Sequence, residues 1–198
     1  MRCLIGFALL LSACTTVPNT SISTNIQVDS PVLPELKLTP STFGRDASLA
    51  QHIAWEIESV HELNNPSFTA RPIDALVEID ENYVRMAFFA INQRVLSLSW
   101  DGTVLKTTRH PLFPKELDPN KILRDLQLNY WPSDTIRAAL PKDWSLKDTK
   151  DQRELIYQGK AQISIHYDAQ PRWLGRTVLV NRIERYKLII ESTQQSAP

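Results

Sequence analysis

Residues 83–109 read YVRMAFFAINQRVLSLSWDGTVLKTTR. Within this stretch, Tyr83 to Ile91 is apolar on nearly both faces of an extended chain. Two further alternating runs, Arg94 to Trp100 and Thr103 to Arg109, flank the dipeptide Asp101-Gly102. An Asp-Gly pair between alternating runs is a strong hairpin signal, because both turn positions need positive φ. The stretch therefore predicts antiparallel strands joined by tight turns.

Strand-like alternation continues on both sides of this stretch. It covers residues 51–59 and 75–80 upstream, and residues 155–158, 163–167 and a long final strand over 177–191 downstream. Gly159-Lys160 is the expected turn of a second hairpin. The pattern predicts about four strands, a helical insertion and about three more strands, with no internal repeat.

The helical insertion covers about residues 118–140. Asp118 is a good N-cap, and Pro119 suits the first helical position. Apolar side chains then recur at helical spacing until Pro132 ends the helix. Ser133 is expected to cap a short second helix through Leu140. Together these elements predict a mainly β (α+β) fold, a highly twisted antiparallel sheet with a helical element across one face.

The N-terminus has the pattern of a bacterial signal peptide. Arg2 provides the positive region, and Leu4 to Leu11 provide an apolar run far below the roughly 20 residues of a spanning helix. The segment 11–14, Leu-Ser-Ala-Cys, resembles the bacterial lipobox. The resemblance implies that residues 1–13 are removed and that Cys14 carries several acyl chains, which together anchor stably. The alternative is an ordinary secretory signal followed by an incidental cysteine.

Composition limits the classes of partner. The 198-residue chain has 42% hydrophobic and 22% charged residues, ordinary values for a globular protein. Loss of Arg2 leaves 21 basic and 22 acidic side chains, so no strong field attracts nucleic acid. Cys14 is the only cysteine left after the signal, which excludes an intramolecular disulfide. We expect a lipidated tether over 14–30, one domain over 31–193 and a polar tail over 194–198.

The block ILRDLQLNYWP at 122–132 resembles an uncharacterised bacterial lipoprotein family, a domain of unknown function. Members are often encoded beside synthesis genes for aryl polyene (flexirubin-type) pigments. The resemblance also covers residues 33–44, 100–102, 137–141, 144, 165–167, 181–182 and 186–188. It implies a LolA/LolB-like architecture, an unclosed, strongly curved half-barrel in which helices form a lid or plug. Those relatives hold acyl chains in the concave apolar face, although no LolB motif is matched here.

Enzyme chemistry is not expected. The chain has five glycines and lacks a phosphate-binding loop or nucleophile elbow. Its four histidines show no metal-ligand spacing, so no metal or cofactor is expected besides the covalent lipid. We interpret Asp118, Asp125 and Asp134 as a helix cap and solvated helix faces.

The candidate binding site is an apolar cavity. The candidate lining residues are Trp55, Met86, Phe88, Phe89, Trp100, Leu123, Leu126, Tyr167 and Tyr186. The alternative is a fully packed core, because cavities and cores are lined by the same residue types. Trp131-Pro132 is either a lid hinge or a helix end with a packed indole.

We expect an outer-membrane lipoprotein that binds a hydrophobic cargo and transfers or inserts it at the periplasmic leaflet. By the resemblance to the Gram-negative sorting pattern, Thr15 after the lipidated cysteine favours the outer membrane. The expected cargo is a lipid, an aryl polyene lipid or an acylated protein, received from a periplasmic LolA-like carrier. The alternative is a non-catalytic structural or adaptor lipoprotein of a cell-envelope complex, which needs a filled core.

Overall fold

The computed structural model describes residues 31–57, 68–69, 72–111, 113 and 117–195. The predicted signal peptide, Cys14 and the tether lie outside these residues. The strands, helices and core residues described below all fall between residues 31 and 195. A chain that begins at residue 14 therefore contains every described strand, helix and core residue.

One antiparallel sheet contains all eleven strands of the described residues. The strands are β1 (Ala47–Ile57), β2 (Phe68–Thr69), β3 (Ile73–Ile79), β4 (Val84–Ala90), β5 (Gln93–Trp100), β6 (Leu105–Arg109), β7 (Trp144–Asp148), β8 (Gln152–Tyr157), β9 (Lys160–Tyr167), β10 (Gly175–Asn181) and β11 (Tyr186–Gln194). Their order is β6-β5-β4-β3-β1-β11-β10-β9-β8-β7, and β2 pairs with β1. Two meanders, β1 to β6 and β7 to β11, are thus joined where β1 pairs with β11.

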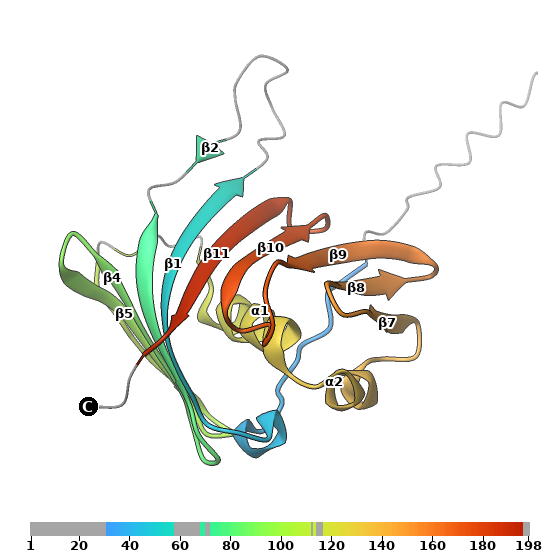
Figure 1. Ribbon diagram of the computed structural model, residues 1–198, viewed down its shortest axis with the longest axis horizontal. Helices are drawn as coiled ribbons and strands as arrows, with labels where there is room; N and C mark the ends of the chain where they lie inside the picture. Colours follow the sequence, from blue (N-terminus) through green and yellow to red (C-terminus); the bar gives the residue numbers. More distant parts are fainter. Residues whose placement is uncertain (1–30, 58–67, 70–71, 112, 114–116, 196–198) are drawn as a thin grey trace, which may run out of the picture.

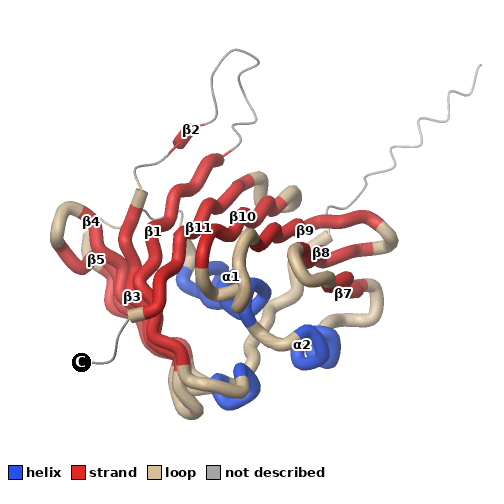
Figure 2. Tube along the Cα trace, viewed as in Figure 1, coloured by secondary structure: helices blue, strands red, loops and turns tan. Residues whose placement is uncertain are grey.

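The sheet is strongly curved and does not close. β6 and β7 stand at the two ends of the strand order, and the sheet bends around α1 (Pro119–Tyr130) (Figure 1). α2 (Ser133–Ala139) lies beside β7, and a short 3-10 helix, η1 (Pro40–Phe43), lies at one end of the half-barrel (Figure 2). These features confirm the expected mainly β half-barrel with its helical insertion. None of the described helices is long and apolar enough to cross a membrane.

Helix α1 begins where the sequence predicts. The side chain of Asp118 accepts a hydrogen bond from the backbone N–H of Asn120 at 2.9 Å, and Pro119 is the first helical residue. Every residue from Leu123 to Tyr130 is buried, so α1 is enclosed instead of lying on the surface. The expectation for the second helix is corrected in one detail, because Ser133 is its first residue and Pro132 holds the N-cap position.

The extended chain before β1 covers part of α1. The backbone C=O of Leu38 accepts a hydrogen bond from Gln127 Nε2 at 2.8 Å, and its N–H donates to Gln127 Oε1 at 3.2 Å. Trp100 Nε1 donates to the same carbonyl at 2.8 Å. These bonds satisfy the polar groups of a buried extended segment, which cannot pair within itself.

Both predicted hairpins form, but their turns differ from expectation. Between β5 and β6 only Gly102 has positive φ, and Asp101 Oδ1 accepts from the backbone N–H groups of Thr103 (2.8 Å) and Val104 (2.7 Å). The aspartate side chain thus builds a longer turn than the expected two-residue one. Between β8 and β9 the residues with positive φ are Gln158 and Gly159, one position before the predicted pair.

The predicted long final strand is wrong. β10 ends at Asn181 and β11 begins at Tyr186, so residues 182–185 form a hairpin turn. Arg185 adopts a φ of 59°, and Asn181 Oδ1 accepts from the backbone N–H of Glu184 at 2.9 Å. β7 was not expected either, so the described chain has five strands after the helices instead of about three. Gln194, expected in the polar tail, ends β11 and pairs with Leu49.

Candidate ligand-binding cavity

A cavity of about 350 Å³ lies between α1 and the strands β1, β3, β4 and β11. Alternate side chains of each strand point into it, as the two-residue period of a strand requires. Ile53 and Trp55 contribute from β1, opposite Ile190 and Leu188 of β11 in the register. Most of the wall is apolar.

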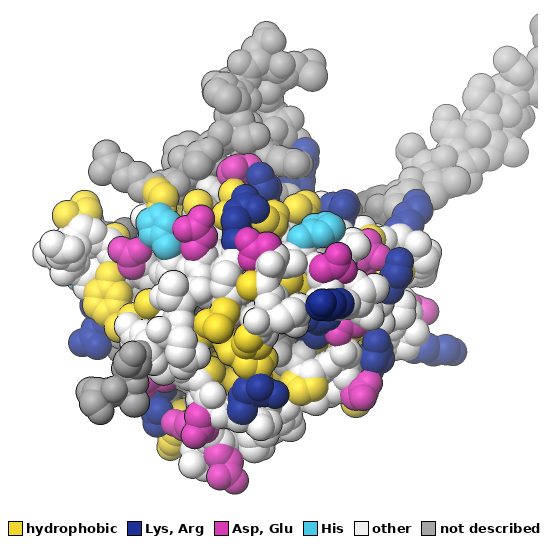
Figure 3. Space-filling model, in the orientation of Figure 1, with side chains coloured by type: hydrophobic (Ala, Val, Ile, Leu, Met, Phe, Trp, Pro, Cys, Tyr) yellow, Lys and Arg dark blue, Asp and Glu magenta, His cyan; other side chains and the backbone are white. Residues whose placement is uncertain are grey.

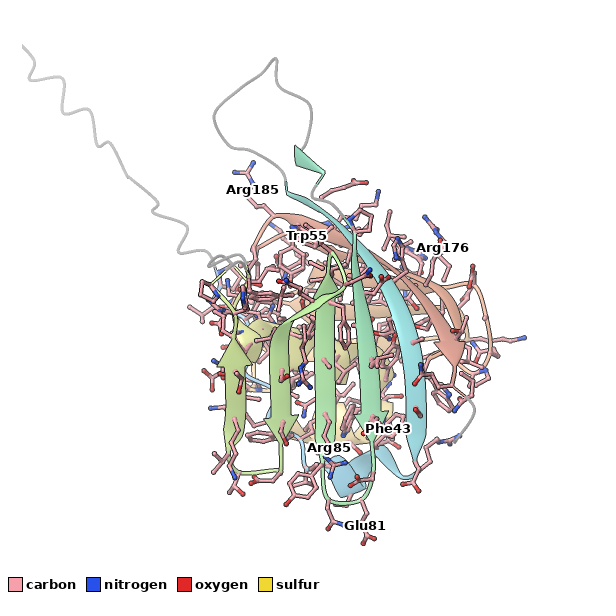
Figure 4. The ribbon with its side chains drawn as sticks, turned by 90° about the vertical axis from the view of Figure 1, so that its left-hand side faces the viewer. Phe43, Trp55, Glu81, Arg85, Arg176 and Arg185 are labelled. Atoms are coloured by element: carbon pink, nitrogen blue, oxygen red, sulfur yellow. The ribbon has the colours of Figure 1, made fainter. Side chains whose placement is uncertain are left out.

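The cavity has a mouth and a deep end. On β1, Gln51 is buried while Trp55 is half-buried, and on β11 Ile190 is buried while Tyr186 is half-buried. About 13 Å of strand separates Gln51 from Trp55 at the usual rise per residue. The same change in burial runs along α1. Tyr130, at the end of the helix, is buried, whereas residues 121–122 near its start, and residues 117–118 just before it, are half-buried or exposed. Trp55 therefore marks the mouth, at the end of the sheet opposite Phe43 (Figure 4).

The structure brings five of the candidate lining residues together around this cavity. They are Trp55, Met86, Phe88, Leu126 and Tyr186. Phe88 and Met86 point inward from β4 because they share the buried face of that strand. Phe89 points to the opposite, outer face and does not line the cavity, which corrects the expectation for this residue.

Three other candidates are core residues outside the cavity. Trp100 is only 2% exposed, and its indole N–H donates to the backbone C=O of Leu38. Tyr167 belongs to β9, which contributes no lining residue, and donates its hydroxyl to the backbone C=O of Asn129 at 2.8 Å. Leu123 is 3% exposed and belongs to the same packed region.

Sequence reasoning missed several lining residues. The alternation of Ile53 with Trp55, and of Tyr186 with Leu188 and Ile190, was a usable signal for β1 and β11. Phe113 gave no signal, because it follows β6 in an irregular segment.

Trp131-Pro132 is a fixed helix end. Trp131 is 0% exposed, its ring centroid lies 5.0 Å from that of Phe43, and its Nε1 donates to Thr42 Oγ1 at 2.9 Å. Pro132 has no N–H for the carbonyl of Leu128, and Arg153 Nη1 donates to that carbonyl at 2.6 Å instead. These contacts argue against a lid hinge and favour the packed alternative.

A network of charged side chains forms one side of the mouth. Arg124 Nη2 donates to Asp125 Oδ1 at 2.9 Å and to Glu184 Oε2 at 2.6 Å. Tyr186 donates its hydroxyl to Asp125 Oδ2, and Lys121 Nζ lies 3.0 Å from Glu184 Oε1. The network contradicts our interpretation of Asp125 as part of a solvated face, because this residue is 6% exposed.

Burial and pairing act on these acids in opposite directions. Burial raises the pKa of Asp125, and the hydrogen bonds and charge of Arg124 and Tyr186 counteract only part of that rise. Burial also tends to raise the pKa of Glu184, but Arg124 and Lys121 hold it below the ordinary value. The carboxylates are thus internally paired, which leaves the mouth with little unpaired charge.

Asn129 differs from the other polar residues of the wall. It lies at the deep end, one helical turn from Asp125, and is 1% exposed. Its side-chain oxygen Oδ1 is the single buried side-chain N or O atom of the described residues that lacks a hydrogen-bond partner. A buried unpartnered acceptor is costly, by about 1–3 kcal/mol.

The described residues contain no group of three or more His, Cys, Asp or Glu side chains that could hold a metal ion. Figure 3 shows positive and negative side chains intermixed over one face of the molecule. The apolar cavity is the feature of the described chain best suited to bind a ligand, because ligand sites are concave and mostly apolar.

Comparison with known proteins identifies a family. The family described as "Protein of unknown function (DUF3261)" matches residues 48–194. No curated protein matches the chain. Among solved structures, the chain is similar to a DUF1329 family protein from Desulfovibrio piger, with a TM-score of 0.34 and 7% sequence identity. That similarity covers 78% of this chain and 87% of the other. Every residue that lines the cavity lies inside the family match.

Proposed function

Because the chain belongs to the DUF3261 family, whose description assigns no activity, we propose its function from the cavity. The protein is a lipid-anchored envelope protein that binds one hydrophobic molecule between α1 and the sheet. It receives or places this cargo at the periplasmic leaflet of the outer membrane. LolA and LolB, which this chain resembles in expected architecture, hold acyl chains in the concave apolar face of a half-barrel.

The apolar cavity is the observation that carries this proposal. Packed protein interiors contain few voids larger than a water molecule, whereas this cavity has about 350 Å³. That volume is near the lower end of the range for ligand pockets, about 300–1,000 Å³. A structural adaptor has no need of such a space, so the cavity favours binding over the adaptor alternative.

The mechanism of transfer is passive. Apolar surface of the cargo exchanges between a carrier's groove, this cavity and the bilayer, at about 25 cal/mol per Å² buried. Burial is similar in each place, so the free energies nearly cancel and no external energy source is required. The cargo is a lipid, an aryl polyene lipid or the acyl chain of a protein.

Anchoring through Cys14 places the domain at the membrane. On this proposal, residues 15–30 form a flexible tether with a span of about 20–25 Å. The domain therefore stays within reach of the leaflet while its mouth exchanges cargo with a soluble periplasmic carrier.

Two neighbouring residues of β11 provide the test. Leu188 lines the cavity, and Ile189 points to the opposite face of the sheet. Leu188→Trp places an indole in the cavity, and Ile189→Trp adds the same group outside it. The chain from residue 14, with Cys14→Ser, is titrated with a dye that fluoresces in apolar surroundings. We expect the dye to bind to the parent and to Ile189→Trp, and to lose at least tenfold in affinity with Leu188→Trp. Equal binding to both variants, with both folded, would refute the proposal.

A further inference from the structure

The network of charged side chains at the mouth is neutral as a whole. Arg124 pairs with Asp125 at 2.9 Å and with Glu184 at 2.6 Å. Lys121 pairs with Glu184 at 3.0 Å. Two cations thus balance two carboxylates, and a surface that approaches the mouth responds to the charges outside this network.

Outside the network, exposed arginines surround the mouth. Each lies in a turn or at a strand end on this side of the sheet, and none has an acidic partner among the described residues. They are Arg94 at the start of β5, Arg109 at the end of β6, and Arg182 and Arg185 in the β10–β11 turn. We call these four residues the arginine rim. The acids nearby are Glu56, which pairs with Lys187, Asp74, which contacts His52, and Asp118, the N-cap of α1. Four arginines therefore stand against two carboxylates without a Lys or Arg partner.

The opposite end of β1 and β3–β6 has the opposite charge. Its carboxylates are Asp46, Glu78, Asp80, Glu81 and Asp101, and its cations are Arg45, Arg85 and Lys106. Figure 4 shows Arg185 at the same end as Trp55 and Glu81 at the other end. The chain as a whole has 22 basic and 22 acidic residues, so its charge is balanced in number but divided in space. An anionic surface is attracted to the mouth end and repelled by the other.

The chain also enters the described domain on the side of the mouth. The extended segment that begins at Pro31 runs from η1 past α1 toward the end at which β1 finishes (Figures 1 and 4). The eleven residues of β1 alone span about 36 Å, whereas the proposed tether spans about 20–25 Å. An anchor at Cys14 therefore holds the mouth end, and not the acidic end, close to the leaflet.

We propose that the mouth end docks on the anionic phospholipid headgroups of the leaflet that carries the anchor, through the arginine rim. Guanidinium groups bind phosphate by paired, charge-assisted hydrogen bonds, and each basic residue near an anionic leaflet strengthens binding about fivefold. The mouth then opens at the bilayer surface, so apolar cargo leaves the cavity without crossing water. The inference rests on the proposed function for the anchor and the cargo.

Chemical modification of arginine identifies the docked face. The chain from residue 14 has one cysteine, Cys14, which is coupled to a maleimide lipid in place of natural acylation. The vesicles contain phosphatidylcholine alone or with about a third of phosphatidylglycerol. Modification by phenylglyoxal, an uncharged reagent, is followed at each arginine by mass spectrometry. We expect Arg94 and Arg185 to react at least threefold more slowly on the anionic vesicles and Arg45, at the opposite end, to react at the same rate on both. High salt should remove the difference, because it screens exposed charges.

Two variants assign the effect to the arginine rim. Arg185→Gln removes one charge from the rim, and Lys106→Gln removes one exposed charge from the opposite end as the matched control. We expect Arg185→Gln to lower the ratio of docked to free domain about fivefold, which restores most of the reactivity of Arg94. Lys106→Gln should leave Arg94 protected.

Three results would overturn the inference. They are equal modification rates on the two kinds of vesicle, slowing that includes Arg45 to the same degree, and protection of Arg94 that survives Arg185→Gln. None of them changes the outcome of the dye titration with Leu188→Trp, so the docking surface and the proposed function can fail separately.

Discussion

Arg153 fixes the end of α1, and its removal gives a large and specific loss of stability. This side chain is 3% exposed and pairs with Asp148 at 3.0 Å. Its Nη1 also donates to the backbone carbonyls of Leu128 at 2.6 Å and Trp131 at 3.0 Å. Because Pro132 cannot donate to the Leu128 carbonyl, no other group of the helix replaces this bond. The change we propose is Arg153→Met, which keeps the length of the side chain and removes its donors.

The expected loss follows from the burial of the partners. Removal of one member of a buried ion pair costs about 3–5 kcal/mol, and Asp148 keeps a second partner in Arg172 at 2.6 Å. We therefore expect Arg153→Met to lower the free energy of unfolding by an amount near the lower limit, about 3 kcal/mol. For a chain of this length that corresponds to a fall in Tm of about 6–12 °C. The matched control is Arg172→Met, which affects the same carboxylate from a more exposed position and should cost about 1 kcal/mol.

The pH dependence separates the ion pair from simple packing. Burial tends to raise the pKa of Asp148, but hydrogen bonds from Arg153 and Ser133 hold it below the ordinary value of 3.8. A folded-state pKa below the unfolded one stabilises the fold at neutral pH, and this stability is lost as pH falls through the folded value. Arg153→Met removes the largest of these lowering contributions. The difference in unfolding free energy between parent and variant should therefore shrink between pH 7 and about pH 3.

Urea denaturation of both variants at the two pH values measures all of these quantities. A loss below about 1 kcal/mol for Arg153→Met at pH 7 would refute the reasoning. A loss that is the same at both pH values would refute the role of the ion pair, although it would leave the carbonyl contacts standing.

Two further predictions test the sheet. Phe88→Ala should lower the free energy of unfolding by about 3–5 kcal/mol, because Phe88 is 4% exposed on the inner face. Phe89→Ala, on the outer face, should lower it by about 1 kcal/mol or less. Similar losses for the two variants in urea denaturation would contradict the assigned faces. Ile91 is 87% exposed and has a φ of 50°, which is unfavourable for a β-branched residue. Ile91→Asn should raise the unfolding free energy by about 1 kcal/mol, since asparagine tolerates this conformation, and a lower value would count against the left-handed turn.

The sequence predicted elements whose signals are local. Asp118 and Pro119 start α1 through a cap and a fixed φ, which depend on two adjacent residues and on nothing distant. The hairpin at Asp101 and Gly102 was predictable for the same reason. The turn at 182–185 was not, because the segment contains no glycine or proline and has the apolar residue Ile183 at its centre. Only pairing between β10 and β11 reveals that the chain reverses there.

The site was harder to predict than the fold, because its residues are not distinguished by type. Leu123 and Leu126 both follow the helical period of α1, yet Leu126 lines the cavity and Leu123 packs elsewhere. A helix buried on all sides gives no polar face from which its orientation could be read. The informative residues were the polar ones, Asp125, which we interpreted as part of a solvated face, and Asn129, which we did not consider; the fold buries both at the cavity wall.

The contacts of α1 also bear on how cargo enters. The helix is held to the extended N-terminal segment by Gln127, to the β10–β11 hairpin by Arg124, and to β8 by Arg153. Lifting it as a lid would break all three attachments, among them the bonds from Arg153 to the carbonyls of Leu128 and Trp131, and hydrogen bonds to a charged group each contribute about 1.5–3 kcal/mol. Passage through the half-buried mouth at Trp55 and Tyr186 breaks none of the bonds of Gln127 or Arg153. In the proposed function α1 is therefore a fixed wall, and cargo exchange depends on side-chain movement at the mouth.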